Sequence, residues 1–257
     1  SSRGSNHDRF DGAFGGVHFP RGANRLTHDV PEIEFRIAAS KTLLDLVFPW
    51  IAQGTFVGGV VGYGLGITRY FTLALRDHSS GRDFRLADCV ATGMTLESTF
   101  GAPGILVVTV RAVAEQFFAD AAGALTFTQA SPADTNVYRH RQLTLTRGAT
   151  LLGASRLSMD FSSGAFPWLH NSRTPLVRKD GGLNVTGQIE GAWTDETDPI
   201  RANSEAEAYE TLTAAWANSS GSGSLTVALA DFIATEVPRA GFETTRYLPF
   251  RAAFQNM

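Results

Sequence analysis

The chain has 257 residues, a formal net charge of −3 and 43% hydrophobic residues, which is enough for one large domain or two of average size. Only 18% of the residues are charged, against roughly 25% in an average globular protein, and no run of Lys or Arg predicts attraction to nucleic acid. No stretch approaches about 20 consecutive apolar residues, so no membrane span is expected. A single cysteine, Cys89, excludes an internal disulfide framework and a Cys-based zinc site.

Alternation of apolar and polar residues is the main local signal. In segment 30–37 the apolar side chains of Ile33, Phe35 and Ile37 share one face, and Glu32, Glu34 and Arg36 share the other. This period of two is typical of a half-buried strand. Further strands are predicted at 69–75, 105–113, 142–146, 155–161, 183–190, 224–230 and 244–254.

Two segments have helical spacing instead. Residues 40–52 place apolar side chains on one helical face after Ser40, a suitable N-cap. Residues 204–217 open with Ser204 in a capping-box pattern and continue with an apolar stripe that includes Trp216. The segments 58–66 and 218–224 are rich in Gly or Ser and are expected to be loops.

Short matches in a constant order indicate that the chain contains two copies of one domain. Gly12-Ala13-Phe14 recurs as Gly164-Ala165-Phe166 at an offset of 152 residues. The other matches are Ile33 and Ile37 with Val185 and Ile189 (152), 72–75 with 226–229 (154), 88–92 with 231–235 (143), and Arg111-Ala112 with Arg251-Ala252 (140). The predicted domains are 1–121 and 122–257. Because the second copy has strands before its Gly-Ala-Phe, we expect the first copy to lack a β segment that preceded Ser1.

The sequence contains none of the common catalytic or metal-binding motifs considered next. The six histidines have no helical metal-binding spacing, and neither a GxSxG elbow nor a GxxxxGK[ST] loop occurs. Cys89 lies in an apolar segment and matches Phe232 in the second copy, which predicts a buried small side chain rather than a nucleophile. We therefore expect no enzymatic activity, no metal and no cofactor.

The second copy resembles the tail tube proteins of long-tailed, siphovirus-like bacteriophages, particularly the duplicated type. The resemblance rests on strand patterns at 142–148, 156–164, 182–191, 225–229 and 250–254 around a helix, and more weakly on 32–37, 70–75 and 105–110 in the first copy. It implies a mainly β (α+β) fold with two tandem β-sandwich or half-barrel domains. Each would carry one flanking helix, and the sheets would close into a β-barrel ring on oligomerisation.

The same resemblance implies a structural role in the virion. Three chains would form a pseudo-hexameric ring, and rings would stack into a hollow tail tube through which phage DNA is ejected. The implied partners are other copies of the chain, a tape-measure protein, tail terminator and tip proteins, and DNA that passes without sequence-specific binding. The implied location is the virion tail, assembled in the host bacterial cytoplasm without membrane contact.

Candidate functional residues follow from this interpretation. A lumen that lets DNA slide needs acidic or neutral side chains, because a basic lining would bind phosphate. Glu32, Glu34 and Glu190 are the candidate lumen-facing residues, and Arg36 on the same strand face then needs a carboxylate partner. Loops 54–66 and 194–204 are candidates for contacts between rings, with ion pairs in the second from Asp195, Glu196, Asp198 and Arg201.

Three other interpretations remain open. The chain is also compatible with the inner tube of a contractile injection device, although such tubes are usually built from single-copy subunits. A virion coat or fibre protein is the second. The third is a carbohydrate-binding or hydrolytic β-sandwich that stacks sugars on Trp50, Trp168, Trp193 or Trp216, of which Trp50 and Trp216 are expected in the core. The polar strand faces are also compatible with plain solvated surface.

Overall fold

The structure is a computed structural model that is mainly β, as predicted. It describes residues 7–8, 25–26, 32–57, 60–77, 79, 81–101, 104–121, 123–126, 137–168, 176–192, 198–217, 223–236 and 249–256. The helical elements among these residues are α1 (Lys41–Ala52), α2 (Asp198–Glu205) and a 3-10 turn at His140–Gln142.

Most strands belong to one 12-stranded antiparallel sheet. Its members are β3 (Glu32–Ala38), β6 (Phe71–Arg76), β7 (Asp83–Thr99), β8 (Leu106–Val113), β9 (Gln116–Asp120), β10 (Leu143–Arg147), β11 (Thr150–Leu152), β12 (Arg156–Ser162), β15 (Asn184–Ala192), β16 (Glu210–Ala217), β17 (Ser224–Glu236) and β18 (Pro249–Asn256). The two-stranded pairs are β1 (His7–Asp8) with β2 (Arg25–Leu26), β4 (Gln53–Val57) with β5 (Val60–Tyr63), and β13 (Ala165–Trp168) with β14 (Leu176–Lys179).

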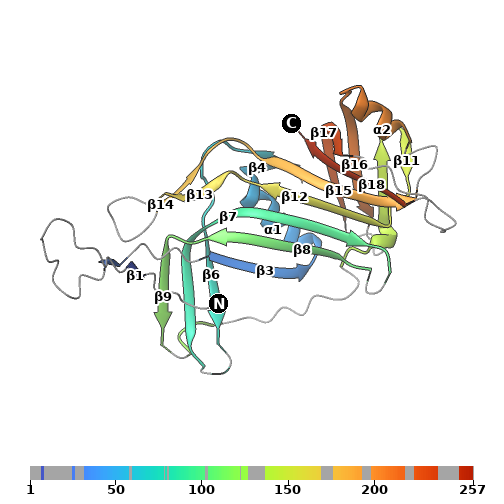
Figure 1. Ribbon diagram of the computed structural model, residues 1–257. Helices are drawn as coiled ribbons and strands as arrows, with labels where there is room; N and C mark the ends of the chain where they lie inside the picture. The colour runs from blue at the N-terminus through green and yellow to red at the C-terminus, as the bar shows by residue number, and fades with distance from the viewer. Residues whose placement is uncertain are drawn as a thin grey trace, which may run out of the picture.

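The large sheet is open in the single chain. Its order is β11-β10-β16-β17-β18-β15-β12-β7-β8-β3, and β6 and β9 pair with the N-terminal half of β7. Strands β15, β12, β7, β8 and β3 lie side by side with α1 behind them (Figure 1). The described strands therefore form no closed barrel within one chain.

The same pairing order occurs twice in this sheet. Group 1 is β3-β8-β7-β6, with α1 following β3, and group 2 is β15-β18-β17-β16, with α2 following β15. Strand β12 lies between the groups and pairs with β7 on one edge and β15 on the other. One cluster of buried side chains runs beneath both groups, so the division at residue 121 stays a prediction.

The strand order and register differ from the sequence match: residues 72–75 lie in β6, whereas the matching residues 226–229 lie in β17, the counterpart of β7. The register of β3 and β15 differs as well. Ile33 lies opposite Ala112, and Ile189 lies opposite Ala252. If Ala112 corresponds to Ala252, then Ile33 corresponds to Ile189 and the offset is 156 residues rather than 152. Under this register 32–34 aligns with 188–190, which matches Glu-Ile-Glu with Gln-Ile-Glu.

Helix α1 agrees with its prediction. The Ser40 hydroxyl accepts a hydrogen bond from the Leu43 N–H at 3.3 Å and caps the helix. The helix buries Leu44, Val47 and Trp50 against the sheet, and the Trp50 indole donates to the Cys89 carbonyl at 3.1 Å. The helix thereby covers the apolar face of group 1.

The second predicted helix, 204–217, is wrong. Helix α2 ends at Glu205, and 210–217 form strand β16 between β10 and β17. Leu212, Ala214 and Trp216 are buried at a period of two. Apolar residues of this segment also occur at helical spacing, which hides the strand pattern in the sequence. Ser204 is not an N-cap, because it lies inside α2 and donates to the Ala234 carbonyl at 2.5 Å.

Candidate functional site

A polar face covers the part of the sheet built from β3, β8, β7, β12 and β15. Alternation along each strand buries the opposite face, including Leu96, Val110 and Met159. Strand register places the following side chains together, and we call them the polar face: Glu32, Glu34, Arg36, Thr95, Glu97, Thr109, Arg111, Arg156, Ser158, Asp160, Thr186, Gln188 and Glu190. All three candidate lumen-facing glutamates belong to it.

A chain of ion pairs crosses the polar face from β3 to β15. The guanidinium of Arg36 lies 3.5 Å from one carboxylate oxygen of Glu97, and that of Arg156 lies 2.8 Å from the other. Arg156 also lies 3.7 Å from a carboxylate oxygen of Glu190. Arg36 therefore has the carboxylate partner that its position on this face requires.

The third arginine of the polar face is also paired. The guanidinium of Arg111, on β8, donates to a carboxylate oxygen of Asp160, on β12, at 2.6 Å, and the Thr95 hydroxyl donates to the same oxygen at 2.6 Å. Strand β7 separates these two strands. Gly93 lies between them on β7, where an added methyl group would meet the guanidinium at 2.8 Å.

The polar face carries more acids than arginines. Glu32 and Glu34 are exposed and form no ion pair within the described ranges, whereas each arginine of the face contacts a carboxylate. Ion pairs this exposed contribute only about 0–1 kcal/mol each to stability. Their main consequence is electrostatic, because a surface with no unpaired guanidinium offers phosphate groups little attraction.

A cavity of about 440 Å³ lies between the polar face and β13. Glu32, Glu34 and Arg111 line one side, and Ala165–Pro167 line the other. The β13–β14 hairpin is held there by Val177, which packs on Val90 and Val113. Among the residues with described positions, no group of His, Cys, Asp and Glu side chains is arranged to hold a metal ion.

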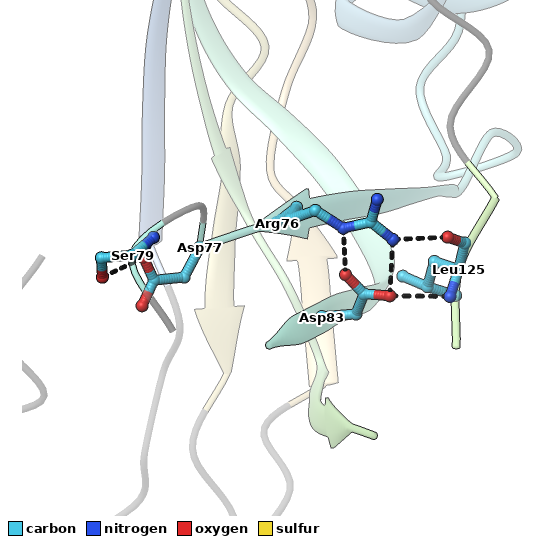
Figure 2. Close-up of polar contacts among 5 residues, drawn as sticks. All are labelled: Arg76, Asp77, Ser79, Asp83 and Leu125. Atoms are coloured by element: carbon cyan, nitrogen blue, oxygen red, sulfur yellow. Dashed lines mark hydrogen bonds and ion pairs between the residues drawn. The ribbon is translucent and has the colours of Figure 1, made fainter. Parts of the chain in front are cut away.

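An arm formed by β6, the N-terminal half of β7 and β9 extends beyond the end of β3 and β8 (Figure 1). Arg76 donates two hydrogen bonds to the buried Asp83 carboxylate, at 2.7 and 3.0 Å. The Leu125 N–H donates to Asp83 at 2.7 Å, and Arg76 donates to the Leu125 carbonyl at 2.7 Å (Figure 2). The hydrogen bonds from Arg76 and then from Leu125 lower the pKa of Asp83.

The two predicted inter-ring loops differ from expectation. Segment 54–66 contains the β4–β5 hairpin, whose apolar side chains are strongly exposed: Val57 75%, Val60 72%, Tyr63 67% and, just beyond the hairpin, Leu65 73%. Such a concentration of exposed apolar groups is typical of an interaction surface. In 194–204, Asp195 and Glu196 lie outside the described residues. Asp198 and Arg201 belong to α2 rather than to a loop, and their side chains are not described.

The tryptophans and the cysteine are largely structural. Trp50 and Trp216 are buried, as predicted, so neither offers a face to a sugar. Trp168 is half-exposed and lies beneath Arg178, whose guanidinium is 4.3 Å from the ring centroid, and Trp193 lies outside the described residues. Cys89 is fully buried as predicted, and burial raises the pKa of its thiol to about 11.

Sequence reasoning placed the glutamates on one face but missed Glu97, Arg111, Arg156 and Asp160. Arg156 and Asp160 lie on the same face of the predicted strand 155–161, and this alternation is the signal that could have identified them.

No family model and no curated protein sequence matches this chain. No helix in the described part of the chain is both long enough and apolar enough to cross a membrane.

Proposed function

We propose that this protein is a structural subunit that assembles into rings of three chains, stacked into a hollow tail tube of a long-tailed phage. The observation that carries the proposal is the polar face, on which every arginine contacts a carboxylate and the acids are in excess. Turned inward, this face lines a lumen that lets DNA slide, because phosphate finds no unpaired cation.

The open edges of the sheet support assembly. Within the described residues, β3 ends the sheet and pairs only with β8. Unpaired strand edges favour pairing with another chain, and closure into a barrel removes them. Each chain contains two groups of strands with the same pairing order, so three chains would supply six similar units to one ring. In such a ring each chain contacts its neighbour through two different surfaces, and rotation from chain to chain closes the ring.

The exposed hairpin supports stacking. The β4–β5 hairpin presents Val57, Val60 and Tyr63 to solvent, and exposed apolar patches of this kind are typical of interaction sites. In a stacked tube these side chains would be buried between rings. The tape-measure, terminator and tip proteins belong to the same proposal as partners of the tube.

Negative-stain electron microscopy of the purified protein, combined with light scattering for mass, tests the proposal. We expect rings or tubes with a central hole and a mass that is a multiple of three chains. Because some tube subunits polymerise only on an initiator, the same measurement is repeated with tail-tip extract. A monomer that persists at high concentration and in the presence of the extract would overturn the proposal.

A further inference from the structure

The cavity between the polar face and β13 has an acidic side. Glu32 and Glu34 line it, are exposed, and form no ion pair within the described ranges. The cation of the cavity, Arg111, already donates to the Asp160 carboxylate at 2.6 Å. The cavity therefore presents two carboxylates that can accept a cation from outside the chain.

The opposite wall of the cavity is apolar and aromatic. Phe166, which is 41% exposed, and Pro167 line it on β13, and Val113 lines it on β8. A guanidinium binds carboxylates through paired hydrogen bonds and is attracted to aromatic rings, while its methylene stem packs along apolar surface. An arginine side chain thus suits both walls, whereas an inorganic cation would leave the apolar wall without a contact.

The chain carries an exposed arginine at the far end of β8. Arg141 lies in the 3-10 turn and forms no ion pair within the part of the chain that the structure describes. The turn is held at the start of β8, because the His140 N–H donates to the Gly104 carbonyl at 2.7 Å and Arg139 pairs with Ile105. The position of Arg141 is therefore fixed relative to the sheet.

Arg141 and the cavity are too far apart to meet within one chain. Glu34 lies opposite Arg111 on β8, and the turn is paired at Ile105, six residues earlier. At about 3.4 Å per residue these positions are separated by roughly 20 Å. A cation at one end of the strand and two carboxylates at the other are complementary when two copies are arranged head to tail.

The cavity also lies at the end of the chain that carries the β4–β5 hairpin. Strand β14 pairs with β13, and its Lys179 ammonium donates to the carbonyl of Gly64, directly after the hairpin. A methyl group added at Gly182 would lie 3.8 Å from the Tyr63 ring of the hairpin. A contact in the cavity would therefore be continuous with the ring-to-ring contact proposed for the hairpin.

We propose, on the basis of the proposed function, that Arg141 of one copy enters the cavity of a copy in the neighbouring ring. Its guanidinium pairs with Glu32 and Glu34, and its stem packs on Phe166. The site is incomplete in the single chain, and the second copy supplies the missing cation. One guanidinium against two carboxylates leaves a negative charge, so the polar face still repels phosphate.

Charge reversal tests this contact in the full-length protein, with rings and tubes counted by negative-stain microscopy. Arg141→Glu and Glu34→Arg each place like charges in the contact, and we expect each to lower the fraction of chains in tubes by about tenfold or more while single rings remain. The double variant Glu34→Arg/Arg141→Glu restores opposite charges and forms tubes of wild-type length. Lys41→Glu, an equal charge change on the exposed side of α1, is the control and leaves the tubes unchanged.

Cross-linking tests the contact directly. In tubes of the Glu34→Cys/Arg141→Cys variant, a bis-maleimide shorter than the separation of the two sites in one chain can join only different copies. Cys89 is fully buried and does not compete. We expect a ladder of linked chains on a denaturing gel, whereas each single-cysteine variant gives at most dimers. The control pair Glu34→Cys/Lys41→Cys should give no ladder.

The outcomes separate this inference from the proposed function. If the wild type forms no ring or tube with or without tail-tip extract, the proposed function fails and the inference fails with it. If the wild type forms tubes and both charge variants form them equally well, the function stands and the inference is overturned. Single variants that are folded by thermal melting but are not rescued by the double variant overturn the pairing, as do double-cysteine tubes that give no ladder.

Discussion

The guanidinium of Arg111 occupies the space that a side chain at Gly93 would fill. A methyl group at Gly93 would lie 2.8 Å from a terminal nitrogen of Arg111, closer than nonbonded atoms approach. The absence of a side chain on the central strand β7 thus lets an arginine of β8 reach Asp160 of β12, two strands away, at 2.6 Å. Gly93 therefore lies where β7 of group 1 pairs with β12.

This geometry predicts an energetic coupling between Gly93 and Asp160. In the wild type, Asp160→Asn should cost at most about 1 kcal/mol, the upper end of the range for an exposed ion pair. In a Gly93→Ala background, where the guanidinium is displaced, the same substitution should cost almost nothing. Chemical denaturation of the four proteins of this double-mutant cycle measures the coupling. Purely additive losses would show that Gly93 does not position Arg111.

The carboxylate of Glu97 should suppress DNA binding. Glu97→Gln removes the carboxylate that both Arg36 and Arg156 contact, which leaves the Arg36 guanidinium without its ion-pair partner. We expect the variant to bind double-stranded DNA, with affinity that falls steeply between about 50 and 200 mM salt. Fluorescence anisotropy measures this binding. Glu207→Gln, which makes the same charge change on an exposed turn, is the matched control, and equal binding by the two variants would contradict the charge-masking role.

The arm should lose stability in acid because of Asp83. Its pKa is lowered in the folded protein by the hydrogen bonds from Arg76 and Leu125, so the unfolded state binds the proton more readily. The stabilisation is therefore complete above the ordinary aspartate pKa of about 3.9 and is lost as the pH falls through the lower folded-state value. Asp83→Asn should flatten this part of the stability profile.

Denaturation between about pH 2 and pH 5 measures the effect, and amide hydrogen exchange on β6 and β9 locates it in the arm. The control is Asp45→Asn, which removes a carboxylate from a solvent-exposed pair with Lys41 on α1. An Asp83→Asn profile that keeps the wild-type slope below pH 4 would assign the acid sensitivity to other groups, among them Asp120, whose pKa the neighbouring Arg85 also lowers.

The elements that sequence reasoning predicted well are those whose faces differ in solvent exposure. Strands β8 and β12 bury one face and β3 half-buries one, so a period of two is visible in the sequence. Strand β7 is missing from the predicted strand ranges, because it has a bulge between Ala91 and Gly93 and changes partners along its course, which interrupts the alternation. The pairing of Arg36 with Glu97 joins residues 61 positions apart, and only the order of strands in the sheet brings them together.

The β4–β5 hairpin should be needed for stacking of rings and not for the fold. Val57 and Val60 lie opposite each other and are 75% and 72% exposed, so Val57→Asp and Val60→Asp should change the stability of the single chain by about 0.5 kcal/mol or less. A carboxylate buried between two rings without a partner is much more costly. We therefore expect single rings in place of tubes, as seen by negative-stain microscopy.

Val60→Ile keeps the apolar character of the hairpin and is the matched control, which should form tubes of wild-type length. Tubes from the aspartate variants as long as those of the wild type would place the ring-to-ring contact elsewhere. In that case the arm would be the next candidate, because Tyr70, Leu75 and Phe118 there are also exposed. Loss of both rings and tubes in these variants would instead assign the hairpin to the contact between chains of one ring, because the substitutions leave the buried core untouched.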